Sequence, residues 1–129
     1  MSKIYIEIIN LKKSFEHNNK SINLFSNFDI KINEGELVAL VGPSGSGKSS
    51  LLHLLALLDE PTQGKIIINK IDTRKLTNIE KDNARRENIS IIFQDNNLLT
   101  DFTAIENIKM PLIIKDERRE IIKKKAEKI

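Results

Sequence analysis

The sequence predicts an α/β fold in which antiparallel strands precede a parallel, three-layer arrangement of strands and helices. Two patterns carry this prediction. Residues 3–11 and 22–32 alternate apolar and polar side chains, which is typical of half-buried strands, and residues 17–20 read as the turn between them. After the turn at residues 33–36, short apolar runs alternate with helical patterns, as in parallel strands linked by helices.

Composition limits the class of protein. The 129 residues are 40% hydrophobic and 30% charged, which is typical of one globular domain and not of a disordered chain. A net charge of +3 is too small to indicate nucleic-acid binding, and the absence of cysteine excludes disulfides and thiolate metal sites. No apolar run approaches the ~18 residues of a membrane span, and the N-terminus lacks a signal-peptide pattern. We therefore expect a cytoplasmic chain with no direct membrane insertion.

The central elements follow in chain order. Residues 37–41 are a continuous apolar run of strand length, and residues 65–68 and 89–93 are two further predicted strands. Residues 47–58 have a helical pattern whose leucines cover nearly every side, so we expect this helix to be buried all round.

Later helices are indicated by their start signals. Thr77 with Glu80, and Thr103 with Glu106, each fit the capping box, in which a hydroxyl and a carboxylate satisfy free backbone N–H groups. Residues 116–128 are rich in charge and predict a last helix with a solvated face.

Residues 42–49, with the sequence GPSGSGKS, match the phosphate-binding P-loop in full, between a predicted buried strand and a predicted helix. Glycines let the backbone present N–H groups to phosphate oxygens, and the helix N-terminus adds partial positive charge. Lys48 would reach the β- and γ-phosphates, and the Ser49 hydroxyl would ligate Mg²⁺. The predicted nucleotide-binding residues here are Gly42, Pro43, Ser44, Gly45, Ser46, Gly47, Lys48, Ser49 and Ser50.

Two other strings imitate nucleotide-site motifs. Residues 57–60 (LLDE) look like the metal-binding string of P-loop ATPases. However, Asp59 lies eleven residues beyond Lys48 on the same predicted helix, roughly 16 Å from the phosphates. Residues 69–72 (NKID) spell a guanine-reading string but come too soon after the P-loop. We interpret the first string as the end of the helix before Pro61, and the second as a turn at a strand end.

Several short matches in the right order resemble the ATP-binding subunits of ABC transporters. Residues 34–39 lead into the P-loop, residues 57–64 resemble the family's L-D-x-P-T-x-G string, and residues 92–94 resemble its Q-loop. Residues 98–112 look most like the lipoprotein-releasing (LolD-type) and macrolide-export subgroup. The resemblance implies an ABC-type nucleotide-binding domain of the P-loop NTPase fold, of which residues 1–129 would be the N-terminal portion.

The resemblance implies roles for further residues. Phe15 would stack on the adenine of ATP, although tyrosine is commoner there, and a core residue at a strand edge is the alternative interpretation. Gln94 would sense Mg²⁺ and the γ-phosphate. Asp95 is a second candidate Mg²⁺ ligand, but its neighbours fit the Q-loop better. Residues 95–107 would form part of the surface that binds a transmembrane subunit. Arg85 and Arg86 would either be charge partners at that surface or lie on a solvated helix face.

The family hydrolyses ATP in a head-to-tail dimer, using a glycine-rich signature loop, a late Asp-Glu pair and a switch histidine. No glycine follows Gly64 in this sequence, the late Asp-Glu pair is absent, and the histidines are His17 and His53. We therefore expect no catalytic residue in this chain and no ATP hydrolysis by it alone. An apolar strand without its neighbours would also make the chain only marginally soluble.

Two functions fit these observations. The chain is either the energising ATP-binding subunit of a transporter for lipoproteins, or a non-catalytic nucleotide-binding or docking remnant of a split or truncated transporter gene. The first implies ATP and Mg²⁺ as cofactors, transmembrane subunits and a second ATP-binding subunit as partners, and a peripheral location on the cytoplasmic face of the inner membrane. A different P-loop enzyme, such as a small nucleotide kinase, is disfavoured because the ordered matches after residue 92 would be coincidence.

Overall fold

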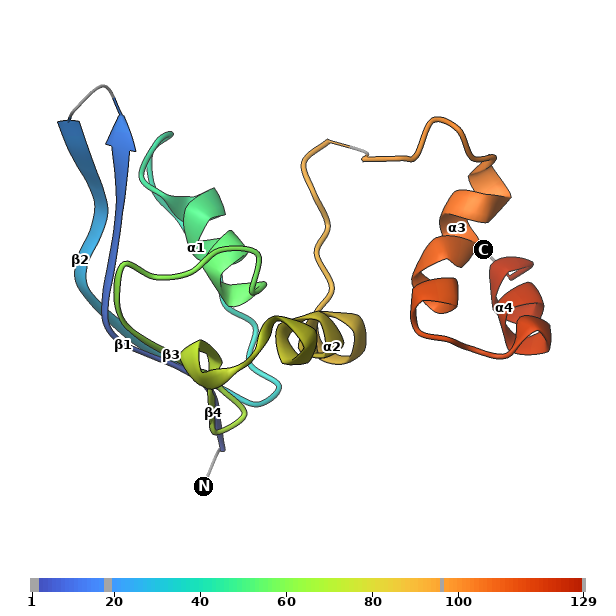
Figure 1. The fold of residues 1–129 in the computed structure, drawn as a ribbon, viewed down its shortest axis with the longest axis horizontal. Coiled ribbons are helices and arrows are strands. Elements are labelled where there is room, and N and C mark those ends of the chain that lie inside the picture. Colours follow the sequence, from blue (N-terminus) through green and yellow to red (C-terminus); the bar gives the residue numbers. More distant parts are fainter. Residues whose placement is uncertain (1–2, 18–19, 96, 129) are drawn as a thin grey trace. The chain divides into compact units, whose positions relative to one another are not determined.

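One antiparallel sheet forms the first part of the chain. The computed structural model describes residues 3–17, 20–95 and 97–128. The order across the sheet is β2-β1-β3-β4, and every strand pairing among these residues is antiparallel (Figure 1). The strands are β1 (Ile4–His17), β2 (Lys20–Asn33), β3 (Gln63–Ile68) and β4 (Ile71–Asp72).

The predicted strands at residues 3–11, 22–32 and 65–68 are confirmed, and each observed strand is longer than its alternating or apolar pattern. β1 and β2 form a long pair because their backbones continue to hydrogen-bond beyond the alternating stretch. The predicted turn at residues 17–20 includes residues 18 and 19, which lie outside the described residues.

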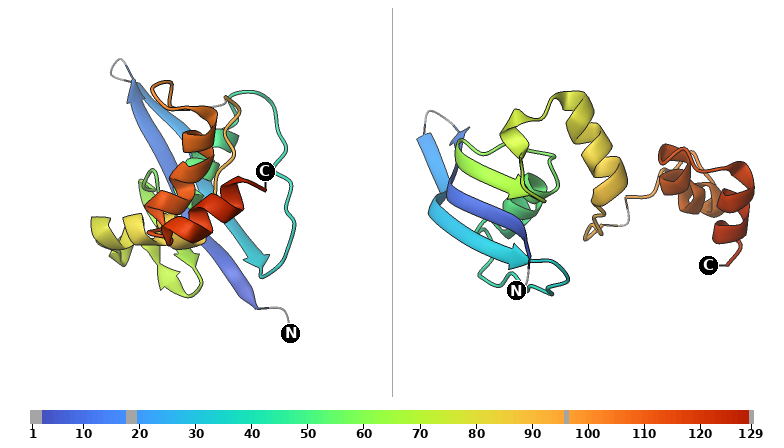
Figure 2. Two further views of the ribbon diagram at one scale, coloured as in Figure 1. Left: turned by 90° about the vertical axis from the view of Figure 1, so that its right-hand side faces the viewer. Right: turned by 90° about the horizontal axis from the view of Figure 1, so that it is seen from below.

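Helix α1 (Lys48–Leu55) packs on one face of the sheet (Figure 2). The expectation of a helix over residues 47–58 that is buried all round was wrong in two respects. The helix ends at Leu55, before Leu58. Within the helix, Leu52 is 54% exposed because a single sheet covers only one side of it. The buried core consists of Ile8, Leu11, Leu51, Leu54 and Ile66.

The two apolar runs predicted as parallel strands are not strands. Residues 37–41 and 89–93 are irregular, and the exposed fractions of Leu37 and Ile92 are both 99%. An apolar run becomes a strand only where a neighbouring backbone accepts and donates its hydrogen bonds. No described residue pairs with either run as a strand. The sequence-based prediction of parallel strands was therefore wrong for residues 37–41 and 89–93.

The remaining elements are short helices. Both predicted capping boxes are confirmed: Thr77 and Glu80 exchange side-chain and backbone hydrogen bonds, and so do Thr103 and Glu106. The predicted last helix is confirmed but is shorter than residues 116–128. These helices are η1 (Thr73–Lys75), α2 (Asn78–Asn88), α3 (Ala104–Ile114) and α4 (Arg119–Ala126).

The chain divides into two units, Met1–Asp82 and Asn83–Ile129, and each is described by itself. The first holds the sheet and α1, and the second holds α3 and α4, which contact each other. None of the helices that the structure describes is long and apolar enough to cross a membrane.

Candidate nucleotide-binding site

The P-loop follows the irregular run 37–41 and closes onto the start of α1. The Ser46 N–H donates to the Pro43 carbonyl at 3.3 Å, which makes a turn. The Lys48 ammonium donates to the carbonyls of Gly42 and Pro43 at 2.8 and 2.6 Å. The loop is therefore curled around its own lysine, and the first residue of α1 places that positive charge inside the curve.

Glycine is required at position 47 for two separate reasons. Its φ of +90° lies in the left-handed region, which side chains with a Cβ rarely adopt. A Cβ at this position would also lie 2.8 Å from the Phe25 ring of β2. Gly47 thus lets the loop turn into α1 while lying directly against the sheet.

The electrostatics of this helix start suit an anion. The first turn of α1 holds no acidic residue, and no side chain caps its free N–H groups. Those N–H groups and the Lys48 ammonium give the loop two sources of positive potential. Ser49 lies in the first turn and is exposed. These residues fit a nucleotide phosphate with its Mg²⁺, and in the described part of the chain no three His, Asp or Glu side chains gather as a metal site of their own.

Phe15 lies near the end of β1, opposite Ile22 of β2. It is 42% exposed, so it is not the core residue of the alternative interpretation. The Lys13 ammonium lies 4.7 Å from the centre of its ring. A partly exposed aromatic ring is what base stacking needs, and its role with adenine stays a prediction.

Lys13 was missed by the sequence analysis. It is only 8% exposed, and its ammonium donates to the Asp59 carboxylate at 2.7 Å and to the Glu60 carbonyl at 2.9 Å. The signal was present, because Leu11, Lys13 and Phe15 share one face of a strand and Leu11 is fully buried.

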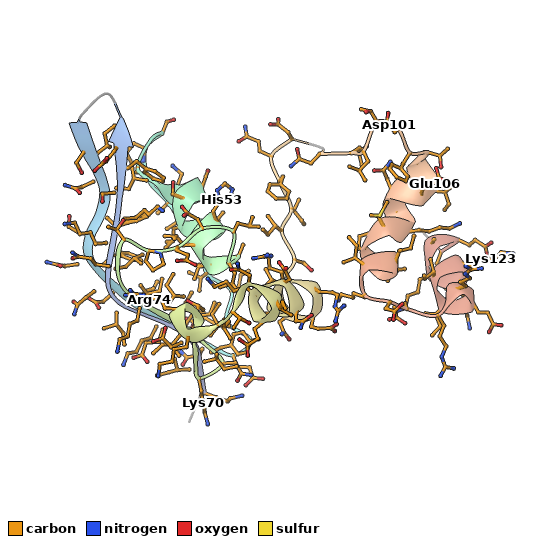
Figure 3. All side chains as sticks on the ribbon, in the orientation of Figure 1. His53, Lys70, Arg74, Asp101, Glu106 and Lys123 are labelled. Atoms are coloured by element: carbon orange, nitrogen blue, oxygen red, sulfur yellow. The ribbon has the colours of Figure 1, made fainter. Side chains whose placement is uncertain are left out.

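Residues 57–60 (LLDE) follow directly after α1, so the predicted helix end before Pro61 is confirmed, although Asp59 lies beyond α1 and not on it as predicted. The two acidic side chains of this string pair with Lys13 and Lys81. Partial burial alone would raise the pKa of the Asp59 carboxyl, but the Lys13 hydrogen bond, the Glu60 backbone N–H and the charges of Lys13 and His53 hold that pKa below its ordinary value. His53 lies on α1 (Figure 3).

The NKID string at residues 69–72 is confirmed as a turn at a strand end. Asn69 and Lys70 connect β3 to β4, and their φ angles are +46° and +69°. Two successive positive φ values are typical of the tight turn of a β-hairpin. Lys70 lies at this turn (Figure 3).

Gln94 and Asp95 lie in the second unit, on the irregular segment after residues 89–93, and both are exposed. The P-loop belongs to the first unit, so the roles of Gln94 and Asp95 in binding Mg²⁺ stay predictions. In the predicted partner surface, residues 95–107, Leu98 and Phe102 are 63% and 44% exposed.

The site has clear relatives among known proteins. Residues 25–129 match the family model described as ABC transporter. The chain is 42% identical over 117 residues to the lipoprotein-releasing system ATP-binding protein LolD of Ehrlichia ruminantium (strain Gardel), covering 90% of this chain and 51% of that protein. It is 38% identical over 114 residues to the protein of the same name from Legionella pneumophila (strain Paris), covering 88% and 50%.

Solved structures agree with the sequence comparison. The dimeric post-hydrolysis structure of the ATP-binding cassette MJ0796, bound to ADP and Pi, matches with a TM-score of 0.88 and 36% identity, covering 95% of this chain and 54% of that one. These matches confirm the predicted α/β P-loop fold class. The chain spans about half the length of the curated relatives it matches. On the match of residues 25–129, this chain belongs to the ABC transporter family.

Proposed function

We propose that this chain binds ATP with Mg²⁺ through residues 42–50 as part of the ATP-binding subunit of an ABC transporter. The observation that carries the proposal is the Lys48 ammonium, held between the carbonyls of Gly42 and Pro43 at the uncapped start of α1. A phosphate group entering the loop would take the place of these carbonyls as the partner of Lys48. On this proposal residues 1–129 are the N-terminal portion of an ATP-binding domain.

Each residue of the site would have its own task. The backbone N–H groups at the start of α1 would bind phosphate oxygens, and Lys48 would neutralise their charge. The Ser49 hydroxyl would ligate Mg²⁺, which when bound shields the charge of the phosphates, and Gln94 would contact the same ion. Phe15 would stack on adenine and orient the base.

The relatives support a wider role for the assembly. The curated relatives are lipoprotein-releasing system ATP-binding proteins, and the MJ0796 cassette is dimeric in its solved structure. We propose that the whole protein energises lipoprotein release with a second ATP-binding subunit and transmembrane partners, at the inner membrane. The intact mass of the native gene product tests the size of that protein directly.

Ligand-dependent melting tests nucleotide binding. We expect Mg-ATP at 100 times its Kd to stabilise the wild-type chain by about 2.7 kcal/mol, because a ligand that binds only the folded state shifts the unfolding equilibrium. Lys48→Ala should lose most of this shift. Lys65→Ala, which removes an exposed lysine of β3, should keep it. An equal shift in wild type and Lys48→Ala would show that residues 42–50 do not bind the nucleotide.

A further inference from the structure

We infer that Lys13 is a positioning residue for the base of the nucleotide, because it holds the Phe15 ring in place from a nearly buried position. The inference rests on the proposed function, in which Phe15 stacks on adenine. Lys13 lies on β1 two residues before Phe15, so both side chains project from one face of the strand. It is not itself placed against the nucleotide.

The ammonium of Lys13 has three fixed neighbours. Two are acceptors, the Asp59 carboxylate at 2.7 Å and the Glu60 carbonyl at 2.9 Å. The third is the face of the Phe15 ring, whose centre is 4.7 Å away. An ammonium against a ring face is attracted by the electrons of that face, and burial strengthens the attraction. With one face against Lys13, the exposed part of the ring is left for a second planar group.

The contacts of Lys13 also connect the Phe15 ring to the segment that follows the phosphate-binding helix α1. Asp59 and Glu60 follow shortly after α1, whose first turn carries Lys48 and Ser49. This segment also hydrogen-bonds alongside β1: the Thr62 N–H donates to the Lys12 carbonyl at 2.9 Å, and the Ser14 N–H donates to the Thr62 hydroxyl at 3.1 Å. Lys13 therefore links the strand that carries the ring to the segment that directly follows α1.

A positioning role predicts a loss that depends on the base. We expect Lys13→Met, which keeps an unbranched side chain of similar size and removes its charge, to weaken ATP binding about 5- to 10-fold, a range equivalent to about 1 to 1.4 kcal/mol. Binding of Mg-tripolyphosphate, which lacks the base, should change less than about twofold. Lys13→Arg keeps a cation that can lie against the ring and should restore ATP affinity.

The double variant Lys13→Met with Phe15→Leu tests whether Lys13 affects ATP binding through the Phe15 ring. If Lys13 acts through Phe15, then Lys13→Met should have no further effect on ATP affinity once the ring is gone. Equal losses for ATP and tripolyphosphate in Lys13→Met would overturn the inference and show a purely structural role. An unchanged ATP affinity in Phe15→Leu would instead overturn the proposed stacking, and an unchanged affinity in Lys48→Ala would overturn the proposed phosphate site.

A spectroscopic test does not require Lys13→Met to fold. The chain contains no tryptophan, so Phe15→Trp introduces a single indole at the position of the ring. We expect ATP to quench its fluorescence and tripolyphosphate to leave it unchanged. Asp59→Asn, which removes the negative charge of the ammonium's partner, should alter the unliganded emission of this tryptophan. No change in emission would show that the Lys13–Asp59 pair does not hold the ring.

Discussion

The side-chain amide of Asn107 holds both backbone groups of Leu99. Its oxygen accepts a hydrogen bond from the Leu99 N–H at 2.8 Å, and its nitrogen donates to the Leu99 carbonyl at 3.1 Å. The same nitrogen also donates to the carbonyls of Phe102 and Thr103. One side chain in the first turns of α3 thus fixes the loop that carries the exposed apolar residues of the predicted partner surface.

We expect Asn107→Ala to loosen this loop. Losing these hydrogen bonds should cost about 1 to 2 kcal/mol of local stability, so the Leu99 amide should exchange with solvent roughly 5 to 30 times faster. Native-state hydrogen exchange measures this change. Asn83→Ala, at an exposed position on α2, is the matched control and should leave the Leu99 amide unaffected. Equal exchange rates in Asn107→Ala and wild type would contradict the role assigned to the amide.

The capping box of α3 makes its helix sensitive to acid. Glu106 lies in the first turn of α3 (Figure 3). The side-chain and backbone hydrogen bonds of Thr103 lower the pKa of its carboxyl from 4.5. A carboxyl with a lowered pKa stabilises the fold above its unfolded pKa, and that contribution is lost as pH falls from about 4.5 through the folded pKa. We expect the stability difference between wild type and Glu106→Gln to be largest near neutral pH and to shrink below pH 4.5.

Unfolding of both chains, followed by circular dichroism from about pH 3 to about pH 7, measures that difference. Glu120→Gln, at the start of α4, is the control for removing one exposed carboxylate. A difference between wild type and Glu106→Gln that stays constant over this range would rule out the ionised cap.

Substitutions at two P-loop glycines distinguish the cost of backbone strain from the cost of overpacking. Gly45 and Gly47 both have positive φ, at +78° and +90°, but a Cβ at Gly45 meets nothing within 4 Å. A Cβ at Gly47 would lie 2.8 Å from the Phe25 ring. We expect Gly45→Ala to lower the free energy of unfolding by about 1 to 2 kcal/mol from backbone strain, and Gly47→Ala by at least about 1 kcal/mol more from overpacking.

Chemical denaturation without nucleotide measures both variants, so their effects on ligand binding do not enter. In a Phe25→Leu background the extra cost of Gly47→Ala should shrink, because the smaller side chain leaves room for the new methyl group. Equal losses for the two glycine variants in the wild-type background would show that the contact with Phe25 does not constrain the loop.

Exposed apolar segments should limit the solubility of the 129-residue chain. Leu37, Val41 and Ile92 are 99%, 86% and 99% exposed, and apolar side chains without cover promote association. We expect Leu37→Lys with Ile92→Lys to raise several-fold the protein concentration at which light scattering begins. Asn23→Lys with Ser26→Lys adds the same charge at exposed polar positions of β2 and should help less. A monomeric wild-type chain with a cooperative thermal transition would refute this expectation.

The sequence alone did not predict which apolar segments form strands. Residues 22–32 and 37–41 both read as strands, but only the first lies beside another strand, β1. The first alternates apolar and polar side chains and the second is continuously apolar, but among the described residues only the first has a neighbouring backbone to pair with. The same reason applies to residues 89–93.

By itself the sequence determined the family, the P-loop and the two capping boxes. The family follows from several short motifs in a set order, and each motif and capping box depends on residues within a few positions of one another. Backbone freedom at Gly47, a lysine one residue later and a helix start need no distant contact to act together. Tertiary structure alone decided the environment of Lys13, which meets Asp59, 46 residues away, beneath the Phe15 ring. Contacts between residues so far apart in sequence form only when the sheet and α1 pack, and packing brought a buried charge, its partner and an exposed ring into one cluster.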